Sequence, residues 1–334
     1  ILDHKEADTG LVMNALSLLE TISYQTCKGS VAEAILSFCF EYIYILANIA
    51  SPSLAINYMT YFSNILANSI MSVESINEIT MEPLIAYFKL TLNLLRLKKS
   101  ALLCKSSLWS IRALILRFSP HNPSNPLHAI KTMQSFGAAL HELRLDEVCT
   151  LSLAFVKDNN QESLQLLTEI LFLIAFATKH FESTAALYSK TLFERLAEAL
   201  LNNNRLLTEE PIILPYLAYL AGVVSNCTSE RLLEIAGNLN ATIVSSLISL
   251  LVTQGVGRRI QREILVVLYN YLVKGLSHVA EDQICSAILK DSRYITDDYF
   301  SKEVLHICFW YIQKQLKLKD DMTSEVGTYV IQIA

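Results

Sequence analysis

The stretch that decides the fold is residues 162–178, ESLQLLTEILFLIAFAT. Its apolar residues Leu164, Leu167, Leu171 and Ile174 recur at intervals of three and four, which places them on one face of an α-helix. The same spacing returns in many other segments, and no segment sustains the strict alternation of a β-strand. The pattern therefore predicts a protein built from amphipathic and buried helices.

The composition agrees with a helical globular protein that has a large core. Of the 334 residues, 52% are hydrophobic, and only nine are glycine and seven proline. A charged fraction of 18% at this hydrophobicity excludes a disordered chain. The formal net charge is −5 and no long Lys/Arg run occurs, so we expect no nucleic-acid partner.

Three further expectations concern the cysteines, membrane spans and catalysis. None of the seven cysteines forms a C-x-x-C pair, which favours a reducing compartment and no structural zinc. The apolar stretches 35–50 and 211–224 are interrupted by Glu41 and Pro215, so no membrane span is expected. No catalytic constellation and no cofactor motif can be assembled, so an enzyme is not expected.

Short polar breaks divide the chain into helical blocks of about 40–50 residues, the spacing of an α-solenoid of the armadillo or HEAT kind. An irregular all-α globule stays open as the alternative. The blocks tend to end in long apolar helices at residues 31–50, 105–118, 162–178, 212–224, 260–274 and 301–314.

Three segments resemble the importin-α family of armadillo proteins. Residues 40–51, FEYIYILANIAS, are similar to the third helix of a repeat, and residues 80–88, TMEPLIAYF, to the opening of the next. Residues 107–133 are similar to a Trp-containing helix, a proline-rich connection and the helix after it, with the prolines at 120–126 as the most specific marker. The resemblance continues through residues 221–251 and 262–288.

This resemblance covers about residues 30–315 and implies the fold and the function. The implied fold is a right-handed α-solenoid of about seven armadillo repeats over residues 1–334 as a single domain. The implied function is a nuclear-transport adaptor that binds nuclear-localisation-type basic peptides in a concave groove. There an Asn amide would clamp the peptide backbone, an aromatic ring would stack on a lysine stem, and carboxylates would receive the ammonium groups. The matching positions are Glu41, Tyr44, Asn48, Trp109, Glu263 and Asn270.

The sequence also departs from the family pattern. Trp109 is the one groove-type Trp that remains, and Ala113 stands where the family has Asn. Each candidate also has a structural reading: Asn48 and Asn270 could cap or bridge helices, and Trp109 could pack between repeats. These departures support an alternative function, an armadillo scaffold that holds a fixed protein partner and is not related to transport.

The partners implied by the resemblance are a protein cargo with an extended basic segment and an importin-β-type carrier. Residues 1–10 are acidic to neutral, so no basic importin-β-binding segment is recognised, and the carrier would bind through a segment outside this chain. The implied locations are the cytoplasm and the nucleus. No membrane partner is expected.

Overall fold

The computed structural model describes residues 9–25, 29–49, 51–72, 81–97, 100–117, 144–156, 160–180, 188–201, 206–276 and 281–318. These residues form fifteen α-helices and two short 3₁₀ helices, and no β-strand occurs among them. The prediction of an all-α protein is therefore confirmed. The proline-rich segment at 120–126 lies outside the described residues.

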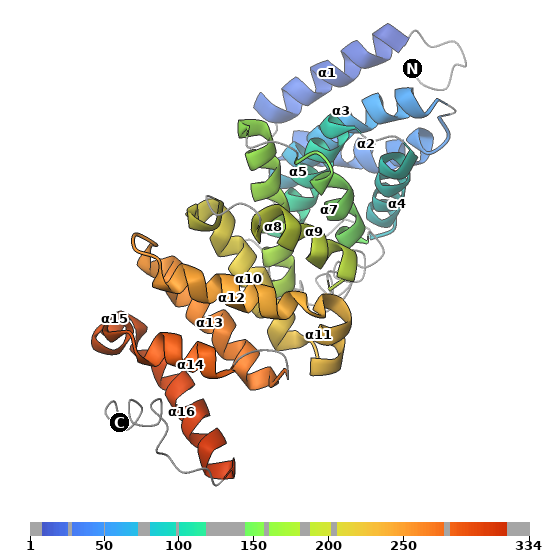
Figure 1. Ribbon diagram of the computed structural model, residues 1–334. Coiled ribbons are helices and arrows are strands. Elements are labelled where there is room, and N and C mark those ends of the chain that lie inside the picture. The colour runs from blue at the N-terminus through green and yellow to red at the C-terminus, as the bar shows by residue number, and fades with distance from the viewer. Residues whose placement is uncertain are drawn as a thin grey trace. The chain divides into compact units, whose positions relative to one another are not determined.

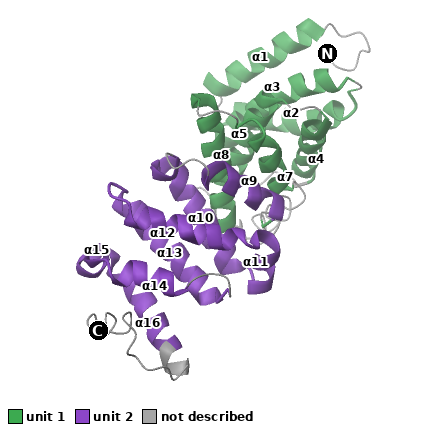
Figure 2. Cartoon of the chain, in the orientation of Figure 1, with its two compact units in different colours: residues 1–188 green, residues 189–334 purple. Residues whose placement is uncertain are grey.

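The chain divides into two compact units, Ile1–Tyr188 and Ser189–Ala334 (Figure 2). The helices of unit 1 are α1 (Thr9–Gln25), α2 (Ser30–Leu46), α3 (Pro52–Ser72), α4 (Met81–Leu97), α5 (Ala101–Arg117), α7 (Leu145–Leu153) and α8 (Gln161–His180). The helices of unit 2 are α9 (Lys190–Leu201), η2 (Leu206–Thr208), α10 (Glu210–Asn226), α11 (Ser229–Ala236), α12 (Leu239–Val252), α13 (Arg258–Lys274), α14 (Glu281–Leu289), α15 (Ser292–Thr296), η3 (Asp298–Phe300) and α16 (Ser301–Leu318).

In unit 1, alternate helices pack in two rows (Figure 1). In the first row, α3 packs against both α1 and α5, and α5 in turn packs against α8. In the second row, α4 contacts both α2 and α7. The rows also contact each other, because α2 packs on α3, α4 on α5 and α7 on α8. This alternation is typical of helical-repeat proteins, in which each repeat buries its apolar face against its neighbours.

The core of unit 1 contains the stripe that the sequence predicted. Leu167, Leu171 and Ile174 of α8 are fully buried, whereas Leu164 in the first turn is half-buried. A second feature of this core is polar: the Tyr87 hydroxyl of α4 donates a hydrogen bond to Ser63 Oγ of α3 at 3.0 Å and is also hydrogen-bonded to Ser110 of α5. Burial raises the pKa of Tyr87, so the phenol stays protonated at neutral pH. The three helices are thereby held together by hydroxyl groups as well as by apolar contact.

Unit 2 has a corresponding row, in which α13 packs against α10 and α16. Helix α12 contacts α9, α13 and α14, and α14 contacts α16. At the end of α13, Lys274 Nζ donates hydrogen bonds to two carbonyl oxygens at the C-terminus of α10, that of Ser225 in the last turn at 3.0 Å and that of Cys227 just after the helix at 2.7 Å. Gly275 then ends α13 in the left-handed region at φ 62°, where a glycine is favoured because it has no Cβ.

The long apolar segments at residues 31–50 and 105–118 lie in different rows of unit 1. Residues 31–50 correspond mainly to α2, which belongs to the second row of unit 1. The helix beside α5 is instead α3, which the block pattern did not single out. Asn64 and Asn68 make α3 look like a surface helix, but their side-chain amides donate to Glu20 Oε1 at 2.7 Å and to Ser23 Oγ at 3.1 Å of α1. These asparagines therefore serve the contact between α1 and α3.

Candidate interaction groove

Three of the predicted site residues, Glu41, Tyr44 and Asn48, lie on or just after α2 and are exposed. The Asn48 side-chain amide donates to the Tyr44 carbonyl oxygen at 2.8 Å, so Asn48 satisfies a carbonyl at the C-terminus of its own helix. Tyr44 is 45% exposed. The structural reading, capping, describes the contact that Asn48 makes.

Two further predicted residues, Glu263 and Asn270, lie on α13 in unit 2, and both are half-buried. The Asn270 amide donates a long hydrogen bond of 3.4 Å to the Ala221 carbonyl oxygen of α10. Asn270 thus bridges two neighbouring helices of its row. The six predicted residues therefore fall on three helices in two units: three at α2, one on α5 and two on α13.

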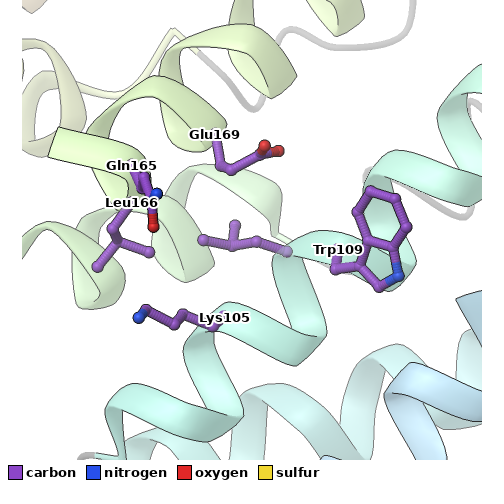
Figure 3. Close-up of a pocket in the computed structure, with 6 residues that line it drawn as sticks. Lys105, Trp109, Gln165, Leu166 and Glu169 are labelled. Atoms are coloured by element: carbon purple, nitrogen blue, oxygen red, sulfur yellow. The ribbon is translucent and has the colours of Figure 1, made fainter. Parts of the chain in front are cut away.

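The sixth predicted residue, Trp109, lies on α5 and is 41% exposed. It borders a hollow between α5 and α8, which we call the α5–α8 groove (Figure 3). The groove has a volume of about 380 Å³. Its lining residues are Lys105, Leu108 and Trp109 of α5, with Gln165, Leu166 and Glu169 of α8.

The groove has an apolar floor and a polar rim. Leu108 and Leu166 are buried, whereas Gln165 is exposed and Glu169 is half-buried. Lys105 Nζ lies 3.8 Å from Glu162 Oε1, a loose ion pair at one end of the groove. A buried apolar centre, an accessible aromatic ring and a polar surround make up the arrangement that protein–protein contact sites share.

A guanidinium group stands beside Trp109, next to the residues that line the groove. Arg112 Nη1 donates to Glu169 Oε1 at 2.5 Å, so the pair links α5 to α8. The Arg112 Cζ atom lies 4.5 Å from the centroid of the Phe172 ring and 5.9 Å from that of Trp109. Both distances are within the range of cation–π attraction. The cation is therefore held by two aromatic rings and one carboxylate.

The sequence analysis did not single out Arg112, Glu169 and Phe172 as a group. A signal for them exists within each helix: Lys105, Trp109 and Arg112 are spaced by four and three, as are residues 162, 165, 169 and 172. Such spacing on positions that the apolar core does not use identifies a second helix face. It does not tell which two faces meet.

The buried thiols are not among the residues that line the groove. Burial raises the pKa of the Cys285 thiol to about 12, with smaller contributions from Asp282 and Cys308. Burial also raises the pKa of Cys104 and Cys149. These thiols pack in the helical core, as small apolar side chains do. Within the described part of the chain, His, Cys, Asp and Glu nowhere gather in threes that could hold a metal ion.

The chain matches no protein-family model, and a search of curated proteins found no match to it. Among the described helices, none is by itself long and apolar enough to cross a membrane, although α11 and α12 together, with a bend of 88° between them, meet that requirement by length and composition.

Proposed function

We propose that this protein is a helical-repeat scaffold of the armadillo type, with right-handed stacking of successive repeats, and that it holds an extended segment of a protein partner. The α5–α8 groove is the contact site in this proposal. The observation that carries it is the placement of Trp109, which is 41% exposed and lines the same groove as the buried Leu108 and Leu166. An accessible tryptophan over an apolar floor is the type of side chain that dominates binding energy at protein interfaces.

The proposal agrees with the hydrogen bonds that polar side chains make between neighbouring helices. Asn64 and Asn68 bond α1 to α3, Arg112 bonds α5 to α8, and Asn270 bonds α13 to α10. A peptide-binding array of the importin-α kind would need its asparagines for the ligand. A scaffold needs only accessible surface between neighbouring helices, and the α5–α8 groove provides it.

Selection from a library of displayed random peptides of about a dozen residues tests the scaffold proposal, because extended segments suit a groove between helices. We expect peptides to be enriched on the wild-type protein and to lose binding on Trp109→Ser. The matched control is Tyr44→Ser, since Tyr44 is exposed to a similar extent, at 45%, but lies on α2. Enriched peptides that bind Trp109→Ser as well as wild type would contradict the assignment of the groove.

A second candidate is the importin-α-like adaptor that binds basic peptides, with a cargo protein and an importin-β-type carrier as partners and the cytoplasm and nucleus as locations. One observation favours it: Trp109 and the carboxylate of Glu169 line the same groove. A titration with a fluorescent lysine-rich peptide separates the two candidates. Binding at micromolar concentration supports the adaptor, and no saturation at about 100 μM supports the scaffold.

A further inference from the structure

Arg112 stands next to the α5–α8 groove and pairs with Glu169, which lines the groove, so a cation of the protein itself already occupies this place. Arg112 places its guanidinium 4.5 Å from the centre of the Phe172 ring and pairs with Glu169 at 2.5 Å. A lysine or arginine of a bound partner would be recognised by the same two features, an aromatic face and a carboxylate. Arg112 therefore occupies the place that a basic partner side chain would need.

The pair formed by Arg112 and Glu169 is partly withdrawn from water. Their side chains are 30% and 34% exposed, whereas the pair at the other end, Lys105 and Glu162, is 41% and 81% exposed. An ion pair that is partly shielded from solvent is stronger than one on the open surface. A partner cation would therefore have to compete with Arg112 for Glu169, whose second oxygen, Oε2, is buried and has no hydrogen-bond partner among the described residues.

The charge balance of the groove points the same way. Glu169 lines the groove and Glu162 lies beside the lining residue Lys105, and each of these carboxylates is paired with a cation of α5. A basic segment entering the groove would meet Lys105 and Arg112, and like charges at short distance repel each other. An uncharged aromatic or aliphatic segment would meet no such repulsion and could pack on Trp109 and the apolar floor.

We propose that Arg112 determines the charge specificity of the groove: it fills a cation subsite formed by Trp109, Phe172 and Glu169, so that the groove accepts an uncharged apolar segment and rejects a basic one. This inference rests on the proposed role of the groove as a protein-binding site. It also implies that a latent subsite for lysine or arginine opens when the Arg112 side chain is removed.

Fluorescence anisotropy with a labelled lysine-rich peptide tests this inference on the full chain. Wild type is expected to show no saturable binding up to about 100 μM. Arg112→Ala is expected to bind the peptide at least about tenfold more tightly, because the aromatic rings and Glu169 are then free for the peptide. The gain should disappear in the double variant Arg112→Ala with Glu169→Gln, and also when Trp109→Ser is added.

A matched control separates the subsite from a general change in charge. Arg231→Ala removes the same charge from an exposed arginine of α11, which pairs with Glu234 in unit 2. This control should gain no affinity for the lysine-rich peptide. If Arg112→Ala fails to fold by circular dichroism, Arg112→Gln takes its place, since it removes the charge and keeps most of the side-chain stem.

Three results would overturn the inference. They are tight binding of the lysine-rich peptide to wild type, no gain in a folded Arg112 variant, and a gain that persists without the Glu169 carboxylate. The proposed function fails separately, because it depends on peptides that wild type enriches and Trp109→Ser does not bind. If the charge specificity fails its test but wild type still binds the selected peptides through Trp109, the scaffold function remains supported.

Discussion

Two buried tyrosines of unit 2 offer a sharp test of the packing around α13. The Tyr271 hydroxyl of α13 donates to Asn240 Oδ1 of α12 at 3.0 Å, and neither residue has any exposed surface. The hydroxyl of Tyr216 on α10 is buried and has no hydrogen-bond partner among the described residues. Burial raises the pKa of both phenols, so both are protonated at neutral pH. The tyrosines thus differ mainly in hydrogen bonding.

The two substitutions by phenylalanine should therefore have different effects. Tyr271→Phe leaves the Asn240 oxygen buried without its donor, which costs about 1–3 kcal/mol in the free energy of unfolding. Tyr216→Phe removes a polar atom that is already unsatisfied, so we expect no loss and a gain of up to about 1 kcal/mol. The volume change is the same in both variants, which makes each the control for the other.

Urea unfolding followed by far-UV circular dichroism measures the difference. With a slope of about 2 kcal/mol per M, a loss of about 2 kcal/mol lowers the midpoint by about 1 M. We expect this shift for Tyr271→Phe in the transition of unit 2, and none or an increase for Tyr216→Phe. Equal losses in the two variants, at unchanged slope, would refute the reasoning from hydrogen bonding.

Three further predictions address the thiols, an ion pair and the asparagines. Six of the seven cysteines are described and all six are buried, and burial raises the pKa of Cys285 to about 12. A thiol reagent at pH 8 should therefore react with at most one thiol before the protein is denatured. Two fast-reacting thiols would contradict this placement. Hydrogen bonding to Arg96 holds the pKa of Glu147 below its usual value, so the pair stabilises the fold above about pH 4 and the contribution is lost as the pH falls through the folded-state pKa. Because Arg96 is 43% exposed, the free energy of unfolding of wild type should exceed that of Glu147→Gln by no more than about 1 kcal/mol at pH 7, and the two should become equal in acid. Urea midpoints that differ by the same amount at pH 7 and in acid would contradict this role of the pair. Asn48→Ala and Asn270→Ala should change the affinity for a display-selected peptide by less than about twofold. A tenfold loss of affinity in either variant would show that the substituted asparagine belongs to the binding site.

The sequence pattern predicted the helices well because helix formation is a local property. The stripe through Leu167, Leu171 and Ile174 is buried in α8, as its spacing indicates. The polar break at residues 255–258 falls between α12 and the start of α13, since glycine favours turns, whereas the break at residues 202–204 lies outside the described residues. Tertiary packing did not override local preference at these positions.

The order of helices in the rows could not be predicted in the same way. The contact of α3 with α5 joins residues far apart in the chain, and periodicity within one helix carries no information about its neighbour. Asn48 and Asn270 show the consequence. They occupy similar positions in the sequence pattern, yet Asn48 bonds to its own helix and Asn270 to the carbonyl of Ala221 on α10.

The candidate site was predicted in part. Trp109 was expected at a binding surface and is accessible in the α5–α8 groove. The partners of Arg112, Glu169 and Phe172, lie on α8, about 60 residues further along the chain. The aromatic and acidic surroundings of Arg112 therefore become visible only when α5 and α8 are packed together.

The central claim is that a protein segment binds over Trp109, and the fluorescence of this residue tests it most directly. The chain has two tryptophans, so Trp310→Phe leaves Trp109 as the single reporter. We expect a display-selected peptide to shift the Trp109 emission to the blue and to reduce its quenching by acrylamide, because binding would cover a ring that is 41% exposed. A peptide that binds by anisotropy while the emission and quenching of Trp109 stay unchanged would contradict the claim.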